Sequence, residues 1–115
     1  DGNGSVGAYS DGLMIVRKLM GVFPGEDLTN KAISSDATRN TNEIHQYIQS
    51  GIDSKALDID QSDSVNAYGD GIMIMRHLMG VFPEQALIDK AIDSNSPYYP
   101  SNWNGVATNI DSLII

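Results

Sequence analysis

The strongest constraint on this chain is an internal repeat. Residues 5–35 and 64–94 are identical at 20 of 31 aligned positions, with a constant offset of 59. Self-similarity of this extent is typical of a duplicated structural unit. Two copies that share a sequence are expected to share a fold and to bury their apolar surfaces together. We therefore interpret the 115 residues as a single domain of two repeats, residues 1–57 and 58–115.

Both repeats show the same order of local signals. A loop rich in Asp, Asn, Gly and Ser leads into a very apolar segment, which predicts helices at residues 11–20 and 70–79. Gly21 and Gly80 follow these segments, and each precedes the tripeptide Val-Phe-Pro. Glycine adopts the left-handed conformation of a helix end, and proline prevents continuation of the helix. Both helices are therefore expected to stop at these glycines.

Additional helices are predicted around this repeated pair. Short helices are expected at residues 26–33 and 84–92. Asn40 and Glu43 have the spacing of a capping box, which predicts that another helix begins after Asn40. The C-terminal stretch favours a last helix at about Val106–Leu113. No segment alternates apolar and polar residues as a strand would, so the predicted fold class is all-α.

The charge balance limits the partners of the chain. Fifteen acidic and seven basic residues give a formal net charge of −8. Such a surface repels nucleic-acid phosphates and anionic lipid headgroups, so neither nucleic acid nor a membrane is expected as a partner. The chain has no cysteine, which excludes disulfides and thiolate metal sites. A small domain without disulfides often depends on a bound metal for its stability.

The acidic loop of the second repeat has the spacing of a calcium site. Asp58, Asp60 and Ser62 occupy loop positions 1, 3 and 5, and Ser64 can offer its carbonyl from position 7. Asp70 opens the following helix as a closing carboxylate. Calcium prefers six to eight oxygen ligands, and alternate loop residues can turn toward one ion. We predict a Ca²⁺ site formed by these five residues.

The first repeat predicts a second, weaker Ca²⁺ site. The repeat alignment places Asp1, Asn3, Ser5 and Asp11 at the positions of the later ligands. The counterpart of Asp58 would precede residue 1, so we expect the chain to be a fragment cut within a loop, and its second site to be the more secure. An ordinary polar turn with an N-capping aspartate would explain one such loop. Two copies, each ending in Asp-Gly before an apolar helix, favour calcium.

This pattern resembles the dockerin family. The resemblance rests on the run Asp58-x-Asp60-x-Ser62, on Asp70 before an apolar helix, and on the similar run Ala8–Gly21. Dockerins carry paired calcium-binding loop–helix units related to half an EF-hand. The resemblance implies duplicated units with pseudo-two-fold symmetry in a module of a larger secreted bacterial protein. It also implies an extracellular or cell-surface location and a cohesin-type protein partner.

Three features depart from the family pattern. The loop from Asp58 to Asp70 spans 13 positions rather than 12, so one residue must bulge. Asp63 occupies a position where glycine is expected, whereas the first repeat has Gly4 there. Ser62 is a neutral ligand where an aspartate would bind calcium more strongly.

The resemblance also nominates a surface for the partner. In dockerins, residues near the end of the loop and along the following helix contact the cohesin. Because the two repeats would present nearly the same face twice, binding in either of two orientations is expected. The implied contact residues are Ala8, Tyr9, Arg17 and Lys18 in the first repeat, and Ala67, Tyr68, Arg76 and His77 in the second.

The sequence also allows functions other than docking. No nucleophile motif or catalytic triad stands out, so the module is expected to be non-catalytic. His45 and His77 are interpreted as surface histidines rather than zinc ligands. A calcium-stabilised structural domain that packs against its own parent enzyme is the main alternative. A carbohydrate-binding module that uses Tyr98, Tyr99 and Trp103 is a third, although these aromatic residues fit a cover over the core better.

Overall fold

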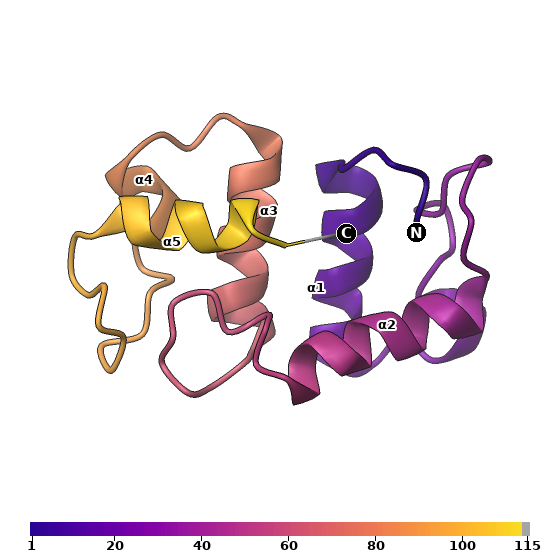
Figure 1. Cartoon of the computed structure of the whole chain (residues 1–115), viewed down its shortest axis with the longest axis horizontal. Coiled ribbons are helices and arrows are strands. Elements are labelled where there is room, and N and C mark those ends of the chain that lie inside the picture. The colour runs from indigo at the N-terminus through magenta and orange to yellow at the C-terminus, as the bar shows by residue number, and fades with distance from the viewer. Residues whose placement is uncertain (114–115) are drawn as a thin grey trace.

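The computed structural model describes residues 1–113, and this range contains helices and loops but no strand (Figure 1). The prediction of an all-α fold is confirmed. No helix in the described range is long and apolar enough to span a lipid bilayer. The elements in chain order are η1 (Ala8–Gly12), α1 (Leu13–Met20), η2 (Gly25–Asp27), α2 (Thr41–Asp53), η3 (Ala67–Gly71), α3 (Ile72–Met79), α4 (Gln85–Ile88) and α5 (Trp103–Asp111).

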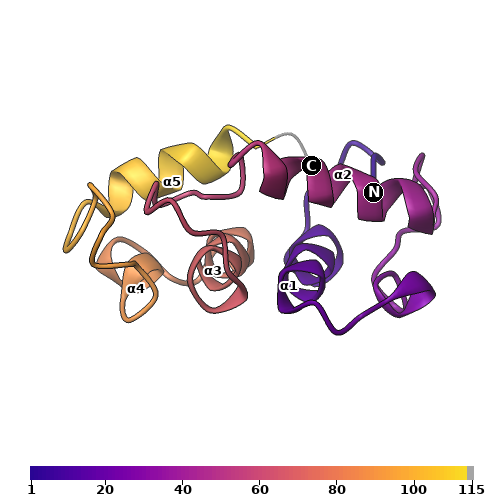
Figure 2. The ribbon, with the colours of Figure 1, turned by 90° about the horizontal axis from the view of Figure 1, so that it is seen from below.

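Helices α1 and α3 follow the two acidic loops and lie side by side at the centre of the molecule (Figures 1 and 2). A Cβ atom added to Gly12 would lie 3.2 Å from Cδ1 of Leu78, and one added to Gly71 would lie 3.4 Å from Cδ1 of Leu19. The start of each helix therefore contacts the end of the other, so the two helices are antiparallel. The absence of side chains at both glycines permits this close approach.

Both helices end as the sequence predicts, but their starts differ: helical turns begin at Ala8 and Ala67, three residues before the predicted starts at residues 11 and 70. Gly21 and Gly80 adopt the left-handed conformation, with φ angles of 76° and 74°. Their N–H groups donate to carbonyls in the last turn, at 3.3 Å from Arg17 O and 3.2 Å from Arg76 O. The first turns, η1 and η3, are π-helical rather than α-helical. A π turn holds an additional residue, and it accommodates the thirteenth position of each loop-to-helix segment.

Each central helix carries an arginine near its C-terminal end, Arg17 in α1 and Arg76 in α3. Its guanidinium binds carbonyls of the segment that follows the helix, a contact that we call the arginine clamp. Nη1 of Arg17 lies 2.8–3.4 Å from three backbone carbonyls, and Nη1 of Arg76 makes the equivalent set at 2.8–3.3 Å. The predicted helices at residues 26–33 and 84–92 are wrong in extent, because only η2 and α4 form. Lys31 and Lys90 both have a φ angle of 59°, a left-handed conformation that interrupts a right-handed helix. The acceptors are Asp27, Leu28 and Asn30 for Arg17, and Ala86, Leu87 and Asp89 for Arg76.

Helices α2 and α5 form a second layer across the other helices (Figure 2). The predicted capping box of α2 is confirmed: the Asn40 side chain accepts from Glu43 N at 2.9 Å, and Glu43 Oε1 accepts from Asn40 N at 3.0 Å. The last helix was predicted at Val106–Leu113, but it spans Trp103–Asp111. It begins earlier because the Asn102 side chain caps it, accepting from Gly105 N at 3.1 Å.

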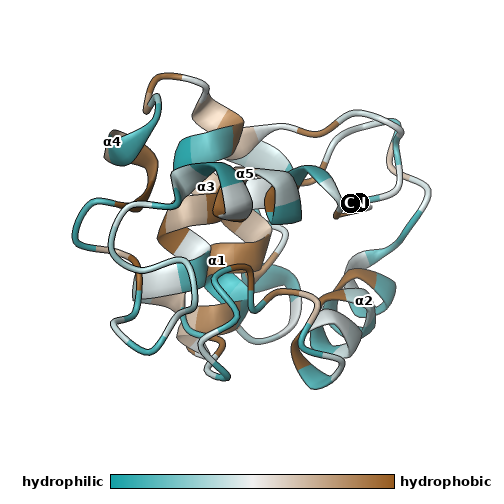
Figure 3. Ribbon diagram, turned by 60° about the vertical axis from the view of Figure 1, so that its left-hand side comes forward, coloured by the Kyte–Doolittle hydropathy of each residue, from teal (hydrophilic) through white to brown (hydrophobic). Residues whose placement is uncertain are grey.

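One hydrophobic core joins the two layers. Apolar residues are frequent on α1 and α3 (Figure 3), and each of these helices fully buries two side chains. The remaining core residues come from α2, α4, α5 and the loops that connect the helices. The buried core consists of Met14, Ile15, Leu28, Ala32, Ile44, Ile48, Leu57, Ile59, Met73, Ile74, Leu87, Ile88, Ala91, Val106 and Ile110.

Candidate metal centre

Three aspartates of the second repeat converge at one point. Asp58 and Asp60 lie in the loop after α2, and Asp70 lies in η3. One carboxylate oxygen from each lies within 4.8 Å of the others, and the three residues are 7%, 2% and 1% exposed. Within residues 1–113 this is the only group of three or more Asp, Glu, His or Cys side chains that could hold a metal ion.

Backbone N–H groups fix the Asp70 carboxylate in place. Oδ1 accepts from Ile59 N at 3.0 Å, and Oδ2 accepts from Asn66 N at 3.2 Å. The same Asn66 closes the π turn through its carbonyl, which accepts from Gly71 N at 3.0 Å. The conformation of the loop end therefore sets the position of the carboxylate.

Asp58 and Asp60 are held by the turn that follows them. Asp58 Oδ2 accepts from Asp63 N at 2.8 Å, and Ser62 N donates to Oδ1 of both Asp58 and Asp60, at 3.1 and 3.2 Å. Asp60 Oδ2 also accepts from Asp93 N at 3.0 Å. Asp93 lies far along the chain, and nothing in the loop spacing predicts this contact.

The cluster concentrates negative charge in a buried place. Burial, followed by the charge of Asp60, raises the pKa of Asp70 to about 7. Burial likewise raises the pKa of Asp58 above its ordinary value. None of the three carboxylates forms an ion pair with a described cationic group. Buried charges are stable only when they are paired, protonated or bound to a metal, so the geometry suits a cation.

Neutral oxygens complete the predicted ligand set. Ser62 Oγ lies 3.5 Å from Asp58 Oδ1 and donates to the Ser64 carbonyl at 3.3 Å. The sequence-predicted residues of the second loop therefore provide carboxylate, hydroxyl and carbonyl oxygens in one region. An all-oxygen set of this kind favours a hard divalent cation over a soft metal.

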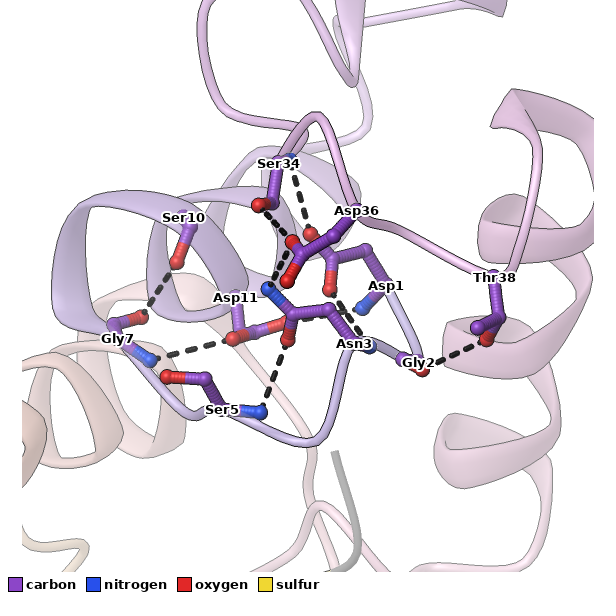
Figure 4. Close-up of polar contacts among 10 residues, drawn as sticks. All are labelled: Asp1, Gly2, Asn3, Ser5, Gly7, Ser10, Asp11, Ser34, Asp36 and Thr38. Atoms are coloured by element: carbon purple, nitrogen blue, oxygen red, sulfur yellow. Dashed lines mark hydrogen bonds and ion pairs between the residues drawn. The ribbon is translucent and has the colours of Figure 1, made fainter.

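Hydrogen bonds link all four predicted ligands of the first loop, since Asn3 N also donates to Asp1 Oδ1 at 3.3 Å (Figure 4). Asp1 and Asp11 are 5% and 2% exposed, and the amino group of Asp1 donates to Asp11 Oδ1 at 2.9 Å. Gly7 N donates to Asp11 Oδ2 at 3.2 Å, as Asn66 does to Asp70. Asn3 and Ser5 are linked to each other, because Ser5 N donates to Asn3 Oδ1 at 3.0 Å. This loop contains no three-carboxylate cluster among the described residues.

The structure adds one acidic residue to the surroundings of the first loop. Asp36 Oδ1 accepts from Asn3 Nδ2 at 3.1 Å and from the Ser34 hydroxyl (Figure 4). These hydrogen bonds lower the pKa of Asp36 below its ordinary value. The repeat alignment places Asn95 opposite Asp36, outside the strongly similar segment. No sequence signal therefore linked Asp36 to the loop.

Comparison of the chain with protein-family models, curated protein sequences and solved structures finds no match.

The eight positions nominated for a partner differ sharply in exposure. Tyr9 and Tyr68 are 71% and 72% exposed, whereas Ala8 and Ala67 are buried. The four remaining positions are half-buried, at Arg17, Lys18, Arg76 and His77. The two tyrosines are thus the most accessible equivalent pair in the nominated set.

The charged members of this set also make contacts within the molecule. Lys18 Nζ lies 3.2 Å from Nδ1 of His45, whose Nε2 donates to Gly25 O at 2.9 Å. His77 Nε2 lies 2.7 Å from Asp111 Oδ1. These contacts tie α1 to α2 and α3 to α5. Both histidines are thus occupied by contacts between helices.

The aromatic residues near the last helix divide between core and surface. Tyr98 and Trp103 are partly buried and pack against the core, whereas Tyr99 is 50% exposed. The Tyr98 hydroxyl accepts from Asn109 Nδ2 at 3.3 Å. This arrangement leaves only one of the three residues open as a stacking surface for a sugar.

The backbone of Asp63 adopts a conformation that is unfavourable for a residue with a side chain. Its φ angle is 72°, matching 80° at Gly4, so an L side chain sits in a region that favours glycine. Asp63→Gly is expected to stabilise the protein by about 1 kcal/mol, because non-glycine residues are strained there. The Asp63 N–H bond to Asp58 remains available, and the lost Lys55 pair is exposed and contributes little. Urea unfolding measures the difference.

The matched control for Asp63→Gly is Gly4→Asp at the equivalent turn. No neighbouring atom obstructs a side chain there, so this variant isolates the backbone strain. It is expected to lose about the same 1 kcal/mol that the first variant gains. An unchanged or lowered stability of Asp63→Gly would contradict the prediction.

Proposed function

We propose that this protein is a non-catalytic, calcium-dependent docking module that attaches a larger secreted protein to a cohesin-type partner. The observation that carries the proposal is the buried cluster of Asp58, Asp60 and Asp70, which lacks a cationic side-chain partner. Within a repeated loop–helix unit, such a cluster has a direct explanation as a cation site. The dockerin-like motif then connects calcium binding with docking.

Calcium is the metal that we assign to the cluster. Magnesium usually keeps several waters and needs few protein ligands, whereas calcium accepts six to eight oxygens in a flexible arrangement. The second loop offers three carboxylates, with the Ser62 hydroxyl and the Ser64 carbonyl nearby. Water would complete the coordination.

A second, weaker site in loop one is part of the same proposal. Its support is that the repeats share unusual backbone conformations at five equivalent pairs, all with positive φ angles. Such detailed agreement favours duplicated units with pseudo-two-fold symmetry. The pairs are Gly2 and Gln61, Gly4 and Asp63, Gly21 and Gly80, Gly25 and Glu84, and Lys31 and Lys90.

The docking surface that we propose centres on exposed residues that recur in both repeats. Tyr9 and Tyr68 are about seven-tenths exposed, and Val22 and Val81 about two-thirds. Tyrosine is frequent among residues that dominate binding energies. Each repeat would offer the partner a tyrosine and a valine, and the pair of repeats would permit binding in two orientations.

The ranking of the two calcium sites is tested by paired substitutions. Asp70→Asn is expected to abolish the tighter calcium transition in calorimetric titration, because it removes one of three clustered charges. Asp11→Asn is expected to remove only the weaker transition. Both residues have both carboxylate oxygens hydrogen-bonded, so the pair is well matched. Loss of the tighter transition in Asp11→Asn instead would reverse the ranking.

Docking is tested with a partner captured from secreted and surface fractions of the producing organism, with calcium and with chelator. Tyr9→Ala and Tyr68→Ala alone are expected to weaken binding only about twofold, because the other orientation substitutes. The double variant is expected to lose about 30-fold or more. Tyr99→Ala, which changes an exposed tyrosine elsewhere, is the control. Complete loss in one single variant would exclude two orientations.

The alternative function is a calcium-stabilised domain that packs against its own parent protein. The observation that favours it is the internal use of most nominated contact positions, including the two arginine clamps. This alternative expects no partner in trans and a stabilising effect on an adjoining domain. Failure to capture any partner, with calcium or with chelator, would favour it over docking.

A further inference from the structure

Two surface pockets lie at equivalent places in the two repeats, and each has a volume of about 530 Å³. Both border the segment that the arginine clamp holds. Asn30 and Lys31 line the first pocket, and Asp89 and Lys90, at the repeat offset of 59, line the second. The recurrence indicates that the duplicated backbone forms the pocket, because most of the side chains around it differ.

The arginine clamp fixes the backbone at the rim of each pocket. In the second repeat, Arg76 Nη1 donates to the Asp89 carbonyl at 2.8 Å, and the next residue, Lys90, has a φ angle of 59°. The first repeat has the same contact at 2.8 Å and the same φ angle at the equivalent positions. Each pocket is therefore bordered by a backbone segment whose conformation does not depend on a ligand.

The two pockets differ in their lining. The first contains Thr29, whose hydroxyl forms a hydrogen bond with the Thr41 hydroxyl at 2.8 Å. In the second pocket, Ile88 takes the place of Thr29 and is fully buried. The second pocket therefore has an apolar surface where the first has hydroxyl groups.

An exposed tyrosine borders the second pocket. Tyr99 is 50% exposed and lies in the loop between α4 and α5, at one end of the molecule (Figure 1). Its N–H donates to the Ser96 carbonyl at 3.1 Å, and the Pro100 carbonyl accepts from Gln85 Nε2 at 3.0 Å. Ser96 is buried, and its hydroxyl donates to the Asp60 carbonyl. These contacts anchor the backbone on both sides of the exposed ring.

The polar groups of the second pocket suit a ligand that carries hydroxyl groups. Asp89 supplies a carboxylate acceptor, Lys90 supplies an ammonium donor, and the Ser94 hydroxyl can act as either. A sugar unit combines several hydroxyl groups with an apolar C–H face, which can lie against an aromatic ring. The formal net charge of −8 disfavours anionic sugars. Neutral sugars therefore fit this pocket best.

We propose that the pocket beside Tyr99 binds one unit of a neutral oligosaccharide, whose apolar face stacks on the Tyr99 ring. Asp89, Lys90 and Ser94 would form hydrogen bonds with its hydroxyl groups. The first pocket has no aromatic side chain among its described lining residues, so it is expected to bind no sugar. This inference rests neither on calcium binding nor on docking to a protein.

The test is a titration of the ¹⁵N-labelled protein with neutral oligosaccharides, followed by nuclear magnetic resonance. The probes are cellopentaose, xylopentaose, mannopentaose and maltopentaose. At least one of them is expected to cause saturable shifts of the amide signals of Lys90, Ser94 and Tyr99. No saturable shift with any of the four probes would overturn the proposal. Shifts confined to residues of the first pocket would overturn it as well.

Substitutions at Tyr99 then test the stacking contact. Tyr99→Ala is expected to weaken the binding about tenfold, because it removes the ring, whereas Tyr99→Phe keeps the ring and should stay within about twofold. Lys31→Ala and Lys90→Ala form a matched pair, since both lysines have the same φ angle. Only Lys90→Ala is expected to weaken the binding. Unchanged affinity in Tyr99→Ala would show that the ring is not part of the site and would overturn the proposal.

Discussion

Calcium at about ten millimolar is expected to raise the melting temperature of this protein by about 5–15 °C over the value in chelator. The reason is that Asp58, Asp60 and Asp70 repel one another in a buried place, and an ion that binds only the folded state removes this repulsion. Ligand at one hundred times its dissociation constant stabilises by about 2.7 kcal/mol. Extracellular calcium modules commonly have dissociation constants of about 10⁻⁴–10⁻³ M, which sets the concentration needed.

Two variants distinguish site binding from a general salt effect. Asp70→Asn is expected to lose most of the calcium-induced shift, because it removes a carboxylate of the cluster. Asp89→Asn removes an exposed acid outside both loops and should keep the full shift. Magnesium at equal ionic strength should produce a smaller shift than calcium. Identical melting curves in calcium and chelator would contradict the assignment of the metal.

In chelator, the stability of the protein is expected to fall as the pH rises from about 4 to about 7. The pKa of Asp70 is about 7 in the folded protein, against an ordinary value of 3.8, so the folded state binds more protons than the unfolded state in this window. The free energy of unfolding must then decrease with pH. The shift corresponds to at most about 4 kcal/mol, and the raised pKa of Asp58 acts in the same direction.

Calcium is expected to reverse this dependence. The ion binds the deprotonated carboxylates and competes with protons, so its stabilising effect should increase with pH over the same window. Urea unfolding at pH 5 and 7.5, with calcium and with chelator, measures both slopes. Asp70→Asn should flatten the slope in chelator, because its amide does not titrate. A rising stability in chelator would show that the Asp70 carboxylate is not the controlling group.

The sequence predicted most of the secondary structure, because the relevant signals are local. The ends of α1 and α3 follow from glycine and proline at fixed positions, and the start of α2 follows from a capping box. The helices predicted at residues 26–33 and 84–92 form only in part, as η2 and α4, because Lys31 and Lys90 adopt positive φ angles and Arg17 and Arg76 bind carbonyls of these segments. Each arginine lies 10 to 13 residues before the carbonyls that it binds, so the local sequence of these segments does not reveal the contact.

The candidate site was also predictable only in part. The 58–70 loop places acids at alternate positions, and such spacing can be recognised in one chain. The contribution of Asp93 N to Asp60, and of Asp36 to Asn3, comes from segments about 33 residues away in sequence. No periodicity connects them to the loops. Both contacts arise because the folded chain returns a distant loop to the acidic loop.

The sequence alone determined the duplication, the all-α class, the helix ends and the acidic loops, because these depend on residue type and short-range spacing. The tertiary structure decided which carboxylates meet and which nominated contact residues remain exposed. Burial is a property of the whole packing: the pKa values of Asp58 and Asp70 rise because the folded chain buries both carboxylates and places Asp60 beside them.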